Sequence, residues 1–214
     1  MQQHRELRIG NLTSSPKELT DLLKAWIVIS LAFAVFITLY QFQGALWSQK
    51  FVFSLIISAF TVGTGFLIHE LAHKIVAQHY GCFAEFRSFD TMLLLAFIMS
   101  FFGFIFAAPG AVMIDGPVGI RRNGKISMAG PLTNLIFAAV FLIGMLLFTS
   151  NVLHTVASYG FYINTVLGLF NMIPVWNFDG RKILAWNKAV YGAMVGVGIL
   201  FLIMQIVAKD KGLF

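Results

Sequence analysis

Charged residues and cysteine are both scarce in this chain of 214 residues. Charged residues make up 11% of the sequence and hydrophobic residues 58%, whereas an ordinary soluble domain is about a quarter charged. Cys82 is the only cysteine, which excludes an internal disulfide and a cysteine-rich zinc knuckle. The composition therefore predicts an integral membrane protein in which any metal is held by His, Asp, Glu or Asn side chains.

Two other sequence signals are also missing. Residues 1–24 are polar and contain acids, so they lack the charged and then apolar order of a cleavable signal peptide. We therefore expect the first apolar run to be a retained helix. The net charge is +6, but the basic residues are dispersed among loops, so nucleic acid is not an expected partner.

Several apolar runs are long enough to cross a hydrocarbon core of about 30 Å. They predict an all-α polytopic membrane protein, a bundle of about five or six transmembrane helices within the lipid bilayer. The expected spans occupy residues 25–40, 51–80, 126–148, 157–173 and 189–208.

A zinc-hydrolase motif, His-Glu-Leu-Ala-His at residues 69–73, follows an uncharged run, residues 51–68. On a helix His69 and His73 project from one face about one turn apart, so both imidazoles can reach one cation. Glu70 lies beside them and can act as a base. The sequence thus places a metal motif inside a membrane span.

A catalytic zinc site normally has a third protein ligand. The other histidines are poorly placed, in the polar tail, on the opposite side and on the far face of the same helix (His4, His154 and His79). Most acids lie in end segments or flanking loops, which leaves Asp179. Pro174 should open the preceding helix, and the opened end would carry Asn171 and Asp179 into an apolar bundle.

The number of membrane crossings between the two polar clusters, residues 69–73 and 171–180, limits the path of the chain between them. If the clusters meet at one depth, their helices run the same way and the 126–148 helix runs the opposite way. Residues 81–125 then begin and end on one side of the membrane. We therefore expect residues 91–125 to form a re-entrant or β-hairpin element, or two short crossings. Within it, residues 108–114 would offer a strand edge to an extended substrate.

Basic residues predict the orientation. With the N-terminus in the cytosol, only Lys50, Lys209 and Lys211 lie outside, and all other Lys and Arg residues lie inside. The N-terminus and the metal motif would then face the cytosolic side of a multi-pass protein.

The motif and the downstream sequence Asn-x-x-Pro-x-x-x-x-Asp-Gly at 171–180 resemble the paired motifs of the site-2 protease family of intramembrane zinc metalloproteases. Residues 128–135 contain Ala-Gly-Pro-x-x-Asn, which is similar to the signature of that family's intervening core helix. The resemblance covers about residues 62–183.

This resemblance implies one catalytic Zn²⁺ held by His69, His73 and Asp179. It also implies Glu70 as general base and Asn171 near the scissile carbonyl. The chain would be a single transmembrane metalloprotease domain, residues 1–214, with its core at about 51–183 and peripheral helices at 16–42 and 188–208.

The implied function is hydrolysis of peptide bonds within or next to transmembrane helices of membrane-protein substrates, as in regulated intramembrane proteolysis. Two alternatives stay open. One is an inactive relative that serves as a membrane scaffold or metal-binding protein, against which the complete set of Glu70 and ligands argues. The other is an ion transporter, which should carry ionisable residues on several spans.

Simpler structural roles are expected for other polar residues. Ser15, Pro16 and Glu18 have the form of a capping box, in which the Glu18 carboxylate reaches back to the helix start. Lys74 is expected to extend to the membrane interface. Asn134 is expected to hydrogen-bond between helices.

Overall fold

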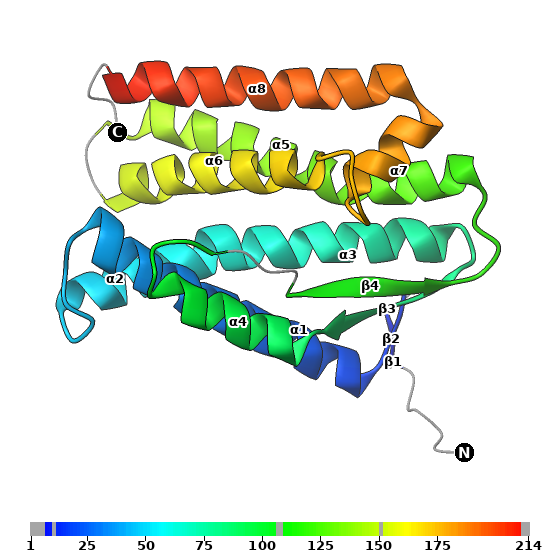
Figure 1. Cartoon of the computed structure of the whole chain (residues 1–214), viewed down its shortest axis with the longest axis horizontal. Helices are drawn as coiled ribbons and strands as arrows, with labels where there is room; N and C mark the ends of the chain where they lie inside the picture. Colours follow the sequence, from blue (N-terminus) through cyan, green and yellow to red (C-terminus); the bar gives the residue numbers. More distant parts are fainter. Residues whose placement is uncertain (1–6, 10–11, 106–108, 150–151, 211–214) are drawn as a thin grey trace. The chain divides into compact units, whose positions relative to one another are not determined.

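The computed structural model describes residues 7–9, 12–105, 109–149 and 152–210, which form mainly helices (Figure 1). The predictions for His4, Arg5, Ala107, Ala108 and Lys211 lie outside these ranges. The chain forms two compact units, Met1–Gly116 and Pro117–Phe214. The expectation of a single domain stays a prediction.

The protein is an all-α polytopic membrane protein. Four helical segments in the described ranges are long and apolar enough to cross a membrane: Pro16–Gln41, Gln49–His79, Ile120–Leu147 and Lys188–Lys209. Helix α6 (Val152–Asn171) has the length of a span but is not among these four, because polar side chains such as Asn164 and Thr165 interrupt it. The expected span at 157–173 is therefore less apolar than the others.

Within the described residues, the first unit contains three helical segments and four short strands. In chain order its elements are β1 (Leu7–Ile9), β2 (Leu12–Ser14), α1 (Pro16–Phe36), the π-helical turn η1 (Ile37–Gln41), α2 (Gln49–Ser58), the π-helical turn η2 (Ala59–Gly63), α3 (Thr64–His79), β3 (Phe83–Ser88), α4 (Asp90–Ser100) and β4 (Gly110–Asp115). Segments α2, η2 and α3 make one continuous helix of 31 residues that carries the metal motif near its end. Gly81, with φ of +76°, follows this helix and turns the chain into β3.

Strands β3 and β4 form a hairpin, which was one of the alternatives expected for residues 91–125, although β3 lies before that range. They pair antiparallel, from Phe83 opposite Asp115 to Ser88 opposite Gly110. The α4 helix between them has 11 residues, about 16 Å, which is too short to cross the hydrocarbon core. Both strands pack beside α3 (Figure 1). The segment between the motif helix and the next long helix thus returns to the end of the sheet from which it started.

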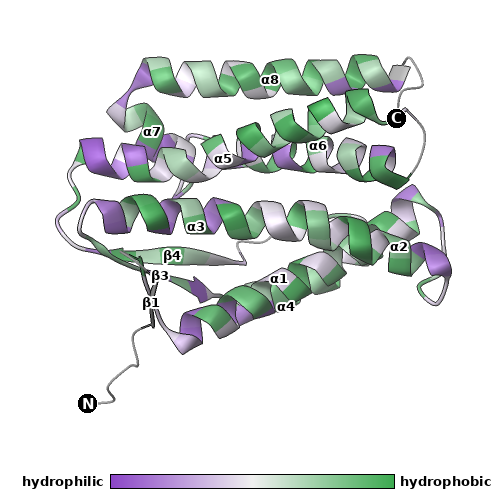
Figure 2. Ribbon diagram, turned by 180° about the vertical axis from the view of Figure 1, so that it is seen from behind, coloured by the Kyte–Doolittle hydropathy of each residue, from purple (hydrophilic) through white to green (hydrophobic). Residues whose placement is uncertain are grey.

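The second unit is a helical bundle of α5 (Ile120–Leu147), α6, α7 (Asp179–Trp186) and α8 (Lys188–Asp210). Hydrophobic residues cover most of α8 and the C-terminal part of α5, whereas hydrophilic residues gather at the N-terminal end of α5 (Figure 2). Asn134 Nδ2 of α5 donates to Asn164 Oδ1 of α6 at 3.1 Å, and both side chains are buried. This contact confirms the expected role of Asn134 as a link between helices.

Candidate metal centre

The two motif histidines lie on α3 one turn apart, as their spacing predicts. Their Nε2 atoms are 3.1 Å apart and their ring planes are inclined by 86°. Both side chains are buried, with His69 5% and His73 8% exposed. Two imidazole nitrogens thus lie close together on one face of an apolar helix.

The separation of these nitrogens fits a shared zinc ion. Two nitrogen ligands at about 2.0–2.1 Å from a tetrahedral zinc lie about 3.3 Å from each other. The observed 3.1 Å is close to this value, so little side-chain movement would be needed for both to bind. Neutral imidazoles are also the ligand type that zinc commonly takes in hydrolases.

Glu70 begins a second row of side chains on α3, next to the histidine row. It is 8% exposed and lies four residues before Lys74 and eight before Gln78, so the three share one side of the helix. The Glu70 carboxylate therefore lies beside the two imidazoles, on the same helix.

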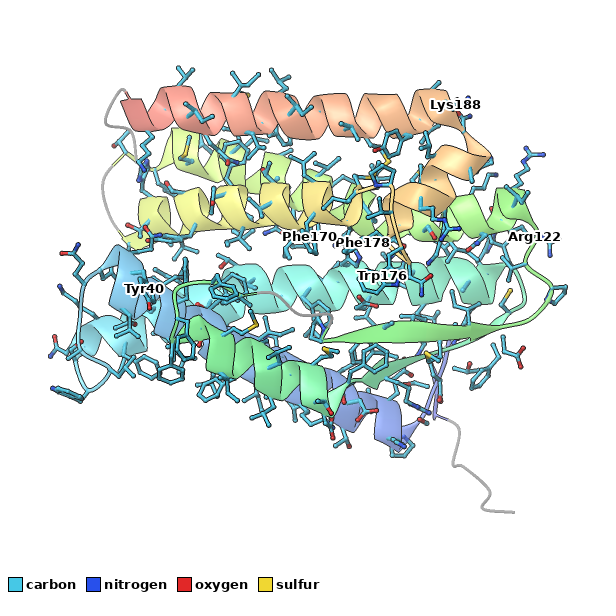
Figure 3. All side chains as sticks on the ribbon, viewed as in Figure 1. Tyr40, Arg122, Phe170, Trp176, Phe178 and Lys188 are labelled. Carbon is cyan, nitrogen blue, oxygen red and sulfur yellow. The ribbon has the colours of Figure 1, made fainter. Side chains whose placement is uncertain are left out.

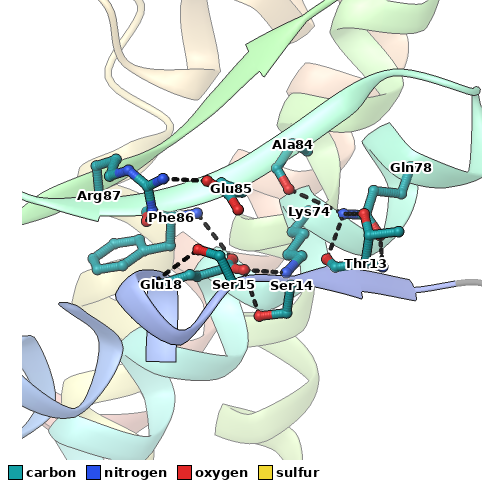
Figure 4. Close-up of polar contacts among 10 residues, drawn as sticks. All are labelled: Thr13, Ser14, Ser15, Glu18, Lys74, Gln78, Ala84, Glu85, Phe86 and Arg87. Carbon is teal, nitrogen blue, oxygen red and sulfur yellow. Dashed lines mark hydrogen bonds and ion pairs between the residues drawn. The ribbon is translucent and has the colours of Figure 1, made fainter. Parts of the chain in front are cut away.

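The structure contradicts the expectation that Lys74 extends to the membrane interface. Its side chain is buried, and Nζ lies 2.5 Å from Glu18 Oε2 of α1 (Figure 4). Only one of the two hydrogen bonds of the predicted capping box forms. Ser15 Oγ does accept the Glu18 N–H at 3.2 Å, but the Glu18 carboxylate turns to Lys74, Ser14 and Phe86. An opposite charge within reach was a better partner for Lys74 than distant headgroups.

In the second unit, Asp179 is the first residue of α7 and is buried. The next residue must be glycine, because a Cβ atom at Gly180 would lie 2.1 Å from the carbonyl oxygen of Met172. The missing side chain lets the start of α7 pack directly on the end of α6. Sequence and packing thus fix the backbone that carries the aspartate.

The loop between α6 and α7 is closed by aromatic and polar contacts. The Phe170 and Phe178 rings, on either side of Pro174, meet edge to face with centroids 5.0 Å apart (Figure 3). Trp176 adopts φ of +50°, and Arg181 Nη1 donates to its carbonyl oxygen at 3.0 Å. These contacts hold Asp179 at a defined point after the proline.

Helix α6 ends at Asn171, three residues before Pro174, as predicted. Asn171 Nδ2 donates to the Leu167 carbonyl oxygen at 2.9 Å, so in this structure the amide bonds its own helix. The exposed side of the α6–α7 loop borders a cavity of about 250 Å³, which is lined by Ile120, Asn123, Trp176, Asn177, Arg181, Lys182 and Ala185. Lys182 Nζ lies 3.8 Å from Asp179 Oδ1.

Of the expected site residues, the first unit brings His69, Glu70 and His73 together on one helix. Asp179 and Asn171 belong to the second unit, and their part in the same centre is a proposal taken up below. Sequence reasoning missed the buried pair of Glu18 and Lys74. The four-residue spacing of the polar residues on α3 was the available signal, because such a row in an apolar helix indicates a buried polar contact.

A helical membrane protein with this histidine pair and adjacent glutamate has the arrangement expected of a membrane metalloprotease. A protein of Methanocaldococcus jannaschii, whose name gives it provisionally as a zinc metalloprotease, is 46% identical over 148 residues, which span 68% of this chain and 77% of the relative. A zinc metalloprotease of the same organism is 32% identical over 125 residues, 55% of this chain and 30% of that relative. No family model matches the chain. No solved structure matches it either. The chain belongs to the zinc metalloprotease family of these relatives.

Proposed function

We propose that this protein is an intramembrane zinc metalloprotease of the site-2 type, which cuts membrane proteins within or next to a transmembrane helix. The observation that carries the proposal is the pair of imidazole nitrogens 3.1 Å apart beside a buried glutamate, on a helix apolar enough to span a membrane. Ionisable groups are costly at membrane depth and are usually retained for function.

Asp179 is the proposed third ligand of one zinc ion. Its burial, its position at the start of α7 and the glycine that follows it support this role. A carboxylate with two histidines is a ligand set of known zinc hydrolases and leaves a position for water. The paired sequence motifs supply the reason to join Asp179 with His69 and His73.

The protein residues then divide the chemistry among them. A bound zinc ion would supply Lewis acidity and lower the pKa of a ligated water toward neutrality. Glu70 takes a proton from the attacking water and hands it to the leaving amine. Asn171 gives up the bond to its own helix and donates its amide to the substrate carbonyl oxygen, which gains negative charge during attack.

The substrate must be extended, because a helix hides its carbonyl groups in backbone hydrogen bonds. We propose that the edge of β4 opposite β3 holds the extended segment by strand addition. Phe86 N donates to Glu18, so Phe86 and its partner Val112 form a pair without mutual backbone hydrogen bonds. The N–H and C=O of Val112 therefore point away from β3, where an added strand would meet them.

The proposed orientation has the N-terminus and the active site toward the cytosol, supported by the distribution of basic residues. Water would reach the centre from that side.

The test is cleavage of a single-span reporter by purified protein in liposomes, with the variant Glu70→Gln as control. Glu70→Gln keeps the ligands, so we expect bound zinc to be unchanged and the rate of cleavage to fall by about 100-fold or more. Asp179→Asn should lower the bound zinc itself. Equal cleavage by Glu70→Gln and wild type would contradict the mechanism.

The same sample separates the alternatives. Zinc binding without cleavage of any reporter would indicate a scaffold or metal-binding protein. Zinc passage into the liposomes without cleavage would indicate a transporter.

A further inference from the structure

One carboxylate, Glu18, connects three elements of the first unit. Its Oε2 lies 2.5 Å from Lys74 Nζ on α3 and accepts the Ser14 hydroxyl at 2.6 Å, and its Oε1 accepts the Phe86 N–H of β3 at 2.9 Å. Glu18 is 0% exposed. Figure 4 shows the carboxylate between the α3 lysine and the β3 backbone. The contacts tie α3 to the hairpin through α1.

Side chains cover the outer edge of β3 at this point. Gln78 Nε2 donates to the Ala84 carbonyl oxygen at 3.0 Å, and Glu18 accepts the Phe86 N–H two residues further on. Alternate residues of a strand direct their backbone groups to the same edge, so both contacts lie on the edge opposite β4. An added strand therefore pairs with β4, and α3 is bonded to the opposite edge of the same hairpin.

Stability alone does not explain a charged pair in this position. Replacing a buried ion pair by well-packed apolar residues is often neutral or stabilising. Gln78 already bonds both Thr13 of β2 and Ala84 of β3 without a charge. The same helix α1 also carries an exposed ion pair, Lys24 with Asp90 of α4. The buried pair differs from this exposed pair because it reaches the helix of the metal motif.

Lys74 connects the ion pair to the metal motif. Lys74 directly follows His73 and lies one helical turn after Glu70. A carboxylate that bonds Lys74 and the Phe86 backbone at once therefore sets how far along α3 the hairpin lies. A slip of two residues in a strand moves the chain by about 6.6 Å while its side chains keep the same faces.

We propose that Glu18 and Lys74 are positioning residues that determine which bond of the substrate reaches the metal. This inference rests on the proposed protease function and on strand addition at β4. The Glu18 bridge fixes the hairpin, the hairpin fixes the register of the bound strand, and that register selects the bond that is cut. Neither residue takes part in the chemistry.

The test compares the products of the single-span reporter, identified by mass spectrometry, for wild type and the variant Glu18→Met/Lys74→Met. Both charges are removed together, so no buried charge is left unpaired. We expect wild type to cut one bond. The variant should keep its zinc content, cut bonds about two residues away and lose about 100-fold in rate at the original bond. Hydrogen exchange at the Phe86 amide should quicken in the variant, a readout that does not need activity.

Two further variants keep the test decisive. If the double methionine variant does not fold, Glu18→Gln/Lys74→Met keeps an acceptor for Phe86 but loses the ion pair, and it should also lose cleavage precision. The reversed pair Glu18→Lys/Lys74→Glu can restore the ion pair, but the new lysine has no acceptor for the Phe86 N–H, so precision should stay lost. Lys24→Met, which breaks the exposed pair on the same helix, should cut as wild type does.

The outcomes separate this inference from the proposed function. A folded double variant that cuts the original bond alone at the wild-type rate would overturn the positioning role while leaving the protease intact. Restored precision in the reversed pair would overturn the bridge to β3. Absence of Glu70-dependent cleavage by wild type would instead contradict the proposed function, and this inference with it.

Discussion

The two units position their candidate ligands by different means. In the first unit, the motif helix is held by a buried ion pair and by hydrogen bonds to a strand backbone, through Glu18, Lys74 and Gln78. In the second unit, the start of α7 is held by backbone packing at Gly180, and the long helices are joined by neutral amides such as Asn134 with Asn164. Coulomb attraction between charged groups acts over several ångströms, whereas packing acts only between atoms in contact. The contrast predicts that the first unit responds most to a change of charge and the second to a change of volume.

The largest effect is expected from breaking the charge balance of the first unit. Lys74→Met leaves the Glu18 carboxylate buried without its ion-pair partner, which should lower the free energy of unfolding by about 3–5 kcal/mol. Unfolding of the protein in detergent measures this value. The double variant Glu18→Met/Lys74→Met should recover most of the loss. If the single and double variants unfold alike, the pair is not electrostatically coupled.

A smaller effect is expected from added volume in the second unit. In Gly180→Ala the new methyl group meets the Met172 carbonyl oxygen, and the forced backbone shift should cost about 1–3 kcal/mol and lower the zinc content. The matched control is Gly192→Ala in α8, where an added Cβ has no atom within 4 Å. The control should unfold no more easily than wild type, since alanine favours a helix over glycine. Equal loss of zinc in both variants would refute the packing argument.

The smallest effect is expected from the neutral amide pair. Asn164→Leu removes the acceptor of the Asn134 amide and keeps the branching of the side chain. Hydrogen bonds between membrane helices contribute about 0.6 kcal/mol on average, so the free energy of unfolding should fall by about this amount. Zinc content and reporter cleavage should stay those of wild type. If Asn164→Leu lowers the free energy of unfolding as much as Lys74→Met does, charged and neutral contacts do not differ in their contribution to stability.

Local rules explain what could be predicted from the sequence. The histidine spacing placed two imidazoles on one face, and Pro174 ended α6 near Asn171 because proline removes a backbone donor. Counting membrane crossings predicted a re-entrant element, a hairpin or two short crossings, because that argument depends only on where a segment starts and ends. These arguments use few residues at a time, so one sequence is enough for them.

Contacts between distant residues could not be predicted in the same way. Glu18 is 56 residues from Lys74 and 68 residues from Phe86. Nothing in the local sequence shows that Lys74 finds a carboxylate rather than the membrane interface, since a long side chain can do either. Asn164 was missed for a similar reason, because its partner Asn134 lies on another helix. The membership of Asp179 in the metal centre depends on a contact of this kind and stays a prediction.

The π-helical turn η2 lies just before the helix that carries the histidines. A single π turn accommodates about one more residue than an α turn while the helix on either side continues. The helix can therefore differ in length by one residue at Ala59–Gly63 without rotating His69 and His73 away from their present direction. In this respect η2 separates the length of the upstream part of the helix from the orientation of the two histidines.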